Sequence, residues 1–337
     1  MTPRPLARAL AVTITLSILL TLTLIAAVAT GAEPIDLSRA WRGVPPDRDI
    51  VVALRLPRAL LGALVGACLA SAGLALQALL RNPLADPFVL GVSGGAALGA
   101  TLFAALGTVL GVASTAGFSP VAVAAFAGAL AAALGVYALG RVGGRLVPER
   151  ALLVGVVFNA FASAVITGIK ISVSPSRAQT LLSWLVGSLG YERPTALLVA
   201  AAFSAAGIFT MMILAGRMNL LALGEEGAAA VGVDVPRTRG ALFLAASLVT
   251  GAAVSLAGLV GFVGLLVPHA ARLILGPDHR SLVPACALGG AAALVLADTG
   301  ARLLFRSLGT EPPVGVVTAL LGGPLFLWLL ARQQEKT

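Results

Sequence analysis

Apolar residues run through the chain in long blocks, and short polar segments separate these blocks. A helix needs ~20 apolar residues to cross a bilayer, and most of the blocks reach that length. The pattern predicts an all-α, polytopic membrane protein with about ten transmembrane helices. The expected spans are residues 10–28, 60–80, 89–110, 120–139, 151–171, 195–215, 241–260, 256–268, 282–304 and 314–330.

Three of these segments depart from a simple span. Residues 89–110 begin with several glycines, so we expect a short or irregular helix there. Residues 256–268 are short and overlap the span before them. Residues 172–189 end in an apolar stretch too short to cross, which predicts an interfacial or re-entrant helix. The first span follows Arg4 and Arg8, and at ~19 residues it is too long for a signal-peptide core.

The composition excludes a soluble domain. Hydrophobic residues make up 58% of the chain and charged residues 11%, against ~45–50% and ~25% in soluble proteins. The 39 glycines suit close packing of membrane helices. We therefore expect one transmembrane domain over residues 1–337, with a first span at 10–28, five spans in 55–215, a polar stretch at 216–239 and four spans in 240–330.

The polar stretch between the spans at 195–215 and 241–260 concentrates charge. It cannot lie in hydrocarbon, because each charge at the bilayer centre costs at least ~2.5–3.5 kcal/mol. We expect one or two short helices at the membrane surface that present carboxylates to a partner in water, a plain solvated helix being the alternative. The charged residues are Arg217, Glu225, Glu226, Asp234, Arg237 and Arg239.

Basic residues favour one orientation only weakly. With both termini in the cytoplasm, thirteen Lys and Arg side chains fall inside and ten outside. The outer residues are numerous enough to suggest an acidic partner on that face. Residues 64–76 also resemble residues 248–260. The two copies lie an odd number of spans apart, which predicts an inverted repeat of the kind found in transporters, unless the match reflects composition alone.

Enzymatic motifs are weak in this chain. A P-loop needs Gly-Lys-Ser/Thr, and neither Lys170 nor Lys336 lies in one, so energy from a nucleotide must come from another chain. His269 and His279 have no zinc-site spacing. Cys68 and Cys286 fall in apolar runs and are expected to be small buried residues.

Two alternative functions use residues within the spans. Ser93 lies in a Gly-x-Ser-x-Gly pattern and could form an intramembrane serine protease with His269. Asp298 lies in an apolar span, where an acid is a candidate ion or proton site for a secondary transporter. Arg302 follows Asp298 by one helical turn, so structural pairing is the expected role. Neither alternative explains the charged stretch at 217–239.

Several motifs resemble the permease subunits of FecCD-type ABC importers, in the same order and over about residues 55–330. They are Arg55-Leu-Pro-Arg58, Gln77-Ala-Leu-Leu-Arg81-Asn-Pro-Leu-Ala-Asp-Pro87, Leu90-Gly-Val-Ser-Gly-Gly95, Met218-Asn-Leu-Leu-Ala-Leu-Gly224, Gly261-Phe-Val-Gly-Leu-Leu-Val-Pro-His269, Asp278-His-Arg280 and Pro313-Val-Gly-Val-Val-Thr-Ala319.

The resemblance implies a multi-pass permease of the inner membrane that imports a ferric siderophore, haem or vitamin B12; we favour an iron complex, with cobalamin as the alternative. It implies a homodimer, two cytoplasmic subunits that bind ATP and magnesium, an external substrate-binding protein, and neither a cofactor nor an ATPase site in this chain. The implied ATPase-coupling residues are Arg217, Met218, Asn219, Leu223, Gly224, Glu225, Glu226, Val231, Gly232 and Asp234, and the implied docking residues for the binding protein are Arg55, Arg58 and Arg302.

Overall fold

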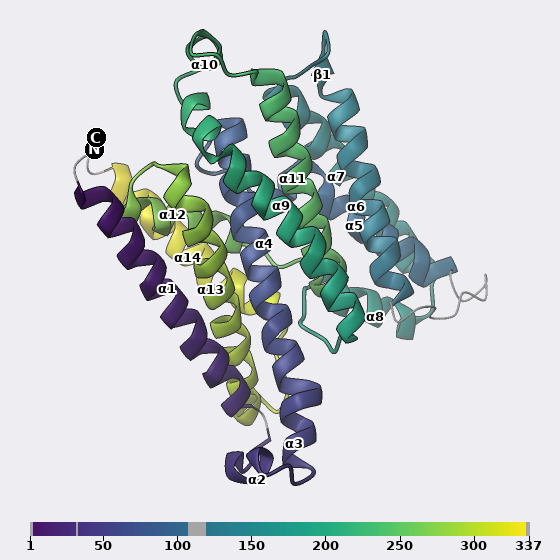
Figure 1. Ribbon diagram of the computed structural model, residues 1–337. Helices are drawn as coiled ribbons and strands as arrows, with labels where there is room; N and C mark the ends of the chain where they lie inside the picture. The colour runs from purple at the N-terminus through teal and green to yellow at the C-terminus, as the bar shows by residue number, and fades with distance from the viewer. Residues whose placement is uncertain (1–2, 32, 107–118, 335–337) are drawn as a thin grey trace.

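The computed structural model describes residues 3–31, 33–106 and 119–334 of the chain. Helices make up most of the described chain and form a bundle (Figure 1). The long apolar helices are α1 (Pro3–Ala29), α4 (Leu56–Leu80), α6 (Pro120–Leu139), α7 (Pro148–Ser172), α9 (Pro194–Leu221), α11 (Val235–Ala257) and α13 (His279–Leu308).

Shorter elements complete the described chain. Three further helices are apolar, namely α5 (Val92–Leu106), α12 (Val263–Leu275) and α14 (Val314–Gln334). The remaining elements are α2 (Leu37–Trp41), α3 (Asp47–Asp49), the π-helical turn η1 (Ile50–Arg55), the 3-10 turn η2 (Pro87–Leu90), a hairpin of β1 (Arg141–Val142) and β2 (Arg145–Leu146), α8 (Pro175–Leu185) and α10 (Glu225–Ala230).

The ten apolar helices confirm the predicted architecture of about ten spans. Seven of them are long and apolar enough to cross a membrane, and the other three correspond to the runs at 89–110, 256–268 and 314–330. The run at 89–110 is short, as expected: η2 forms its first turn, α5 ends at Leu106, and residues 107–110 lie outside the described part. The segment at 172–189 contains the separate short helix α8.

Two helices run beyond the predicted spans because polar residues continue them. Helix α9 extends past residue 215 to Leu221, and α11 begins at Val235 rather than 241. Both ends keep their backbone hydrogen bonds in water, where a charged side chain is inexpensive. The expected overlap of spans at 256–260 is also wrong, since α11 ends at Ala257 and α12 begins at Val263.

Helix α4 is, with α11, an inner helix of the bundle. It packs against α9, α11, α12 and α13, and 78% of an 18-residue apolar stretch in its span is buried, against 83% in α11. Glycines permit this packing: a Cβ at Gly66 would overlap the backbone carbonyl of Gly290 in α13, and one at Gly73 would overlap that of Gly264 in α12. Close approach of backbones through small residues is how membrane helices gain packing energy.

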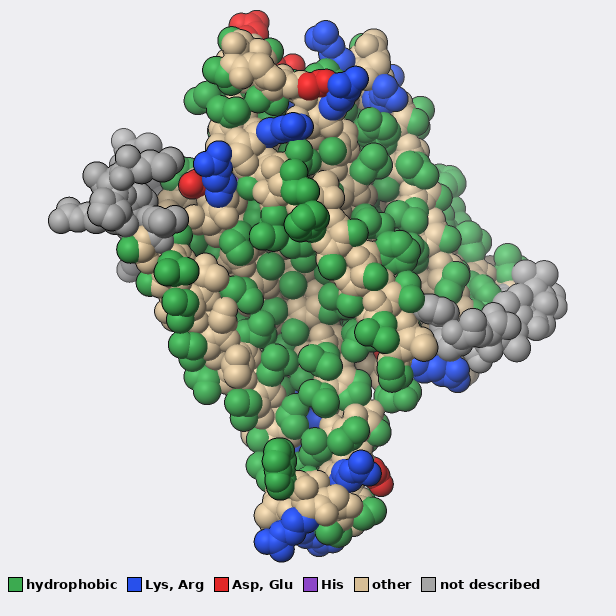
Figure 2. Space-filling model, in the orientation of Figure 1, with side chains coloured by type: hydrophobic (Ala, Val, Ile, Leu, Met, Phe, Trp, Pro, Cys, Tyr) green, Lys and Arg blue, Asp and Glu red, His purple; other side chains and the backbone are tan. Residues whose placement is uncertain are grey.

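Charged side chains gather at the two ends of the bundle. Figure 2 shows hydrophobic side chains over the middle, with arginines and acids at both extremes. One end carries α10 and the β1–β2 hairpin, and the opposite end carries α2 and α3 (Figure 1). Helices α4 and α11 run in opposite directions between these ends, as an inverted repeat requires, although the repeat itself stays a prediction.

Candidate functional site

The end that carries α10 contains all ten predicted coupling residues. Helix α9 supplies Arg217, Met218 and Asn219, and α10 supplies Glu225 and Glu226. Glycines permit the sharp turns on either side of α10, because Gly224 and Gly232 have φ of 102° and 87°, values that side chains disfavour. Asp234 then caps α11 by accepting a hydrogen bond from the backbone N–H of Arg237 at 3.0 Å.

Some side chains of this surface are buried in the core and others are exposed to solvent. Met218 is buried and packs in the core, whereas Leu223 and Val231 are 66% and 60% exposed. Glu225 forms an ion pair with Arg239 at 2.5 Å, and the arginine is buried while the glutamate is exposed. Among the described residues Glu226 is exposed and has no ion pair. Exposed acidic side chains on α10 and exposed apolar side chains in the turns beside it offer a surface to a partner protein.

A hydrogen-bonded network holds the end of α9 against the start of α13. The Nδ2 group of Asn219 donates to Asp278 at 2.6 Å, and the Oδ1 of Asn219 accepts from the backbone N–H of His279 at 2.8 Å. Burial alone would raise the pKa of Asp278, but the hydrogen bonds from Asn219 and from the Arg280 backbone outweigh it, so the pKa lies below its ordinary value. Sequence reasoning missed this network, since its members lie about sixty positions apart and share no local pattern.

The opposite end contains Arg55, Arg58 and Arg302. Arg55 and Arg302 are 6% and 5% exposed. Arg55 donates to the carbonyl oxygens of Val28 and Ala29, and Arg302 donates to that of Ala27 at 3.0 Å. These two guanidinium groups therefore tie the end of α1 to η1, just before α4, and to α13.

Asp298 joins two of these arginines. It pairs with Arg302 at 3.1 Å and with Arg58 at 2.7 Å, and it is 2% exposed. Arg58 also pairs with Glu311 and keeps 24% of its side chain exposed. The expected pairing of Asp298 with Arg302 is confirmed. An acid held by two arginines is a poor proton or ion site, which weakens the secondary-transporter alternative.

The serine-protease alternative lacks its central contact. The Ser93 hydroxyl donates to the backbone carbonyl of Phe88 at 3.0 Å. The Nε2 of His269 has no hydrogen-bond partner in the described chain. A serine nucleophile needs a hydrogen bond to its base, and these two side chains do not make one.

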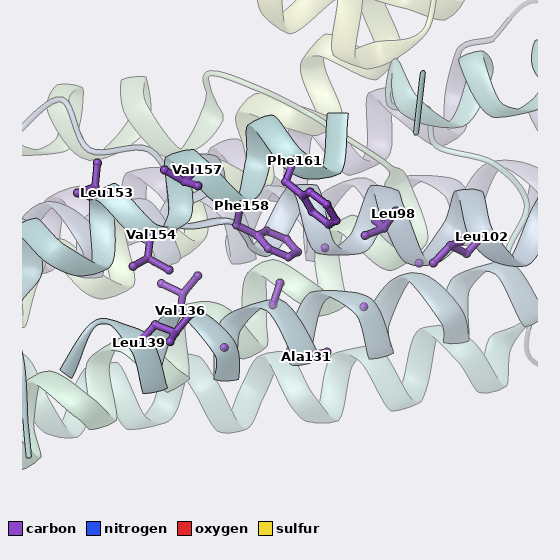
Figure 3. A pocket seen from close by; sticks show the side chains of 15 residues that line it. Leu98, Leu102, Ala131, Val136, Leu139, Leu153, Val154, Val157, Phe158 and Phe161 are labelled. Carbon is purple, nitrogen blue, oxygen red and sulfur yellow. The ribbon is translucent and has the colours of Figure 1, made fainter. Parts of the chain in front are cut away.

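Two cavities open beside α5 and α7. The larger, about 850 Å³, is lined by side chains of α5, α6 and α7 such as Leu98, Val136 and Phe158 (Figure 3). Its lining is hydrocarbon, so it offers no group that could orient a charged ligand. The smaller, about 400 Å³, has a mixed lining: Ala97, Ile166, Leu185 and Leu259 form its apolar part, and Ser93 forms the polar part with a row of side chains on α7, namely Asn159, Ser163, Thr167 and Lys170.

The spacing of that row is four, four and three residues, which places its members on one face of α7. Most other exposed side chains of α7 are apolar, including Leu153, Val157 and Phe161. Lys170 lies in the last turn of α7, where its long side chain can place the ammonium group in water. This face of α7 therefore suits contact with water or a polar ligand rather than lipid.

Comparisons with known proteins agree with this geometry. Residues 18–332 match the model of the FecCD transport family. The chain is 45% identical to the cobalamin import system permease BtuC of Halobacterium salinarum, over 87% of this chain and 77% of that protein. It is 40% identical to the hemin transport system permease HmuU of Yersinia pestis, over 91% of each chain.

Similarity extends to an iron chelatin transport system permease of Helicobacter pylori strain 26695, with 38% identity over 84% of this chain and 82% of that one. A solved structure of a metal-chelate type ABC transporter in an inward-facing conformation superposes with a TM-score of 0.81 and 30% identity. It covers 96% of this chain and 99% of the other.

Proposed function

This chain belongs to the FecCD transport family of ABC importer permeases, and from that premise we propose that it imports an iron complex, a ferric siderophore or haem. As a permease subunit it has no ATPase activity of its own. In the proposal it is a homodimer in the inner membrane with both termini in the cytoplasm. Two ATP- and magnesium-binding subunits drive it, and an external binding protein delivers the substrate.

The observation that carries the proposal is a charged surface at each end of an apolar bundle. At one end, α10 and the turns beside it expose acids together with Leu223 and Val231, as a contact with a soluble ATPase requires. The opposite end carries arginines, among them the partly exposed Arg58, and these suit an acidic binding protein because the guanidinium group binds carboxylates bidentately. In this proposal the helical bundle between these ends contains the translocation pathway.

The polar cavity on α7 supports an iron complex as the substrate. Lys170 gives it a positive charge beside three hydrogen-bonding side chains. Carboxylate, catecholate and hydroxamate groups of iron chelates would find both charge and hydrogen-bond donors there. Cobalamin is the second candidate, favoured by the 45% identity to a cobalamin import permease.

Uptake into vesicles tests the function and the coupling surface together. We expect vesicles with this chain, its ATPase and its binding protein to accumulate radioactive iron chelate only when ATP is supplied. Changing both Glu225 and Glu226 to Arg should abolish uptake, because like charges in a contact cost several kcal/mol. Stronger accumulation of cobalamin than of any iron complex would reverse the choice of substrate.

Glu226→Arg alone separates docking from local folding. Glu225 pairs with the buried Arg239, so its reversal also perturbs the start of α11. Glu226 has no ion pair among the described residues, and its reversal should reduce uptake while the permease stays folded. Glu33→Arg, an exposed reversal near the opposite end, is the control for coupling. Normal uptake by the double variant would remove α10 from the coupling surface.

The docking role of Arg55, Arg58 and Arg302 stays a prediction. Arg58 is the most accessible of the three, and we expect Arg58→Gln to weaken association of the binding protein about tenfold at low salt. The association rate of the wild type should fall steeply as salt rises, because steering between exposed charges is screened. Surface plasmon resonance at several salt concentrations measures both effects.

Two further variants sharpen that test. Arg42 and Arg48 are exposed on the segment of α2 and α3 at the same end, and Arg42→Gln and Arg48→Gln, made separately, each give a matched loss of one charge. An equal loss of affinity from either variant would indicate diffuse attraction rather than docking at Arg58. Unchanged affinity of Arg58→Gln would leave the three arginines as structural ties at the helix ends.

A further inference from the structure

An open groove runs along the outside of the bundle between α6 and α7, with α5 as its third wall (Figure 3). Its volume is about 850 Å³, and every side chain that lines it is apolar. Leu102, Leu139, Leu153, Val157 and Phe161 line it and are between 40% and 64% exposed. The groove therefore opens sideways, toward the hydrocarbon that surrounds a membrane-spanning bundle.

The groove has the length of one lipid tail. Gly128 and Leu139 are its first and last lining residues on α6, and at ~1.5 Å per residue they lie ~16 Å apart along the helix. One leaflet contributes about half of the ~30 Å hydrocarbon core, so a lipid tail spans ~15 Å. Gly135 leaves the groove deep, because nothing lies within 4 Å of the position of an added Cβ.

A basic hairpin lies at one end of the groove. The hairpin of β1 and β2 joins α6 to α7 there. From the hairpin to the first turn of α7 the chain carries Arg141, Arg145 and Arg150, all exposed, and Glu149 as its single acid. Figure 2 shows basic side chains gathered at this end of the bundle, where Figure 1 labels β1. The apolar groove therefore meets a net positive charge at the level of the lipid headgroups.

Arg150 continues the groove face of α7. It precedes Val154, Val157 and Phe161 by successive steps of four, three and four residues, which places all four on one face of the helix. Side chains of a helix lean toward its N-terminus, and Arg150 lies in the first turn of α7. The guanidinium group of Arg150 is therefore carried toward the headgroup layer, in line with the groove.

The three arginines are available for a negatively charged ligand. Among the described residues, none of them has a carboxylate within ion-pairing distance. Arg141 donates to the carbonyl oxygen of Gly144 at 2.8 Å and stacks over the ring of Tyr137, which leaves Arg145 and Arg150 as the freer pair. An exposed arginine with no acid beside it suits a phosphate, whose oxygens accept two parallel hydrogen bonds from one guanidinium group.

The charge of the headgroup decides which lipid is retained. A tail gains no hydrophobic free energy when it leaves other lipid tails for the groove, because those tails are as apolar as the groove. Preference for one lipid must therefore come from the headgroup, and clusters of basic residues beside membrane helices attract anionic lipids. A zwitterionic headgroup brings its own cation next to the arginines, whereas an anionic headgroup does not.

We propose that the groove between α6 and α7 binds one acyl chain of an anionic phospholipid, and that Arg145 and Arg150 bind its phosphate. This site is separate from the polar row on α7, since Val157 and Asn159 lie two residues apart and so ~200° apart around the helix. Neither the transported substrate nor the ATPase enters the inference, so the permease by itself tests it.

Photochemical labelling in vesicles tests the site. The permease is placed in phosphatidylcholine vesicles that contain a small share of phosphatidylglycerol with a diazirine near the middle of one acyl chain. Light releases nitrogen gas from the diazirine, and the carbene that remains inserts into a neighbouring C–H bond. We expect adducts concentrated at Gly135, Val157 and their neighbours in the groove, as mapped by mass spectrometry. Unlabelled phosphatidylglycerol should compete with the probe.

Variants separate the headgroup contact from the groove. Arg145→Gln with Arg150→Gln should reduce labelling of the groove about 25-fold, at roughly fivefold for each arginine near the surface. Arg217→Gln with Arg237→Gln is the matched control, because it removes two exposed charges at the same end but on α9 and α11. That control should leave labelling of the groove within about twofold of the wild type.

Gly135→Leu tests the groove itself. Its side chain enters the open space of the groove, so it should displace the acyl chain and reduce the adducts at Val157 while all three arginines remain. Gel filtration reports whether each variant is folded. If Gly135→Leu does not fold, the comparison of the two arginine pairs decides, because all four of those side chains are exposed.

Three results would overturn the proposal. Equal labelling of the groove by a phosphatidylcholine probe with the same diazirine would mean that any tail enters it. Labelling that is unchanged in Arg145→Gln with Arg150→Gln would remove the arginines from the site. A folded permease with no adduct in the groove would mean that protein covers it, such as a second copy of this chain.

Discussion

Gly73→Ala is expected to destabilise the folded permease strongly, although it adds a single methyl group. The added Cβ would overlap the backbone carbonyl of Gly264, so α4 and α12 would have to separate along their contact. Overpacking of this kind costs ~1–3 kcal/mol when side chains can move, and here the obstacle is backbone. We expect a fall in the midpoint of thermal unfolding in detergent and a lower yield of monodisperse protein.

Gly135→Ala is the matched control for that change. Gly135 also lies within a membrane helix, α6, but nothing approaches within 4 Å of the position of an added Cβ. Alanine is the better helix former by ~1 kcal/mol, so this variant should unfold at the same temperature as the wild type or higher. Equal stability of the Gly73 and Gly135 variants would contradict the close contact of α4 with α12.

Asp298→Asn is expected to give the second large effect. The carboxylate neutralises Arg302 and part of the charge of Arg58, and all three lie at the end of the bundle away from α10. Removal of one partner of a buried pair typically costs ~3–5 kcal/mol, because the remaining charge stays buried. Arg58 retains Glu311, so we expect the lower part of that range, measured by chemical unfolding.

A double variant distinguishes charge from packing. Arg302→Met together with Asp298→Asn removes the orphaned cation, although it also removes the hydrogen bonds of Arg302 to Ala27 and Thr30. The double variant should therefore lose less stability than the sum of the losses in the two single variants. Asp36→Asn is the exposed control: Asp36 caps the short helix α2, and asparagine is an equally good cap. If the two single losses add in full, the carboxylate does not act by neutralising Arg302.

Local sequence determined the helices of the bundle. The apolar run at 120–139 coincides with α6 in both bounds: Pro120 is tolerated in a first turn, and the chain turns into the β1–β2 hairpin soon after Leu139. In a bilayer every backbone N–H and C=O must be paired within its own segment, so a long apolar run has essentially one conformation available. Charge is excluded from hydrocarbon, and for that reason the sequence also predicted a charged surface around α10.

Helix bounds near water were harder to predict from sequence. Arg217 and Asn219 end the apolar run but continue α9, since a helix needs no hydrophobicity once it leaves the membrane. At the other boundary, Gly258 has a φ of 68° and separates α11 from α12 within a continuous apolar stretch. A hydropathy profile shows neither the extension of α9 nor the break at Gly258, because it measures solvation rather than backbone conformation.

Only the tertiary structure decided which charges meet. The sequence placed Arg55, Arg58 and Arg302 at one end, but it did not show that Arg55 and Arg302 are buried against the end of α1. Likewise it did not bring Gln77 to Arg272, which lies 195 positions further along the chain. Solvation acts on each segment independently and so can be read from local sequence, whereas the partner of a buried charge depends on how distant helices pack around α4.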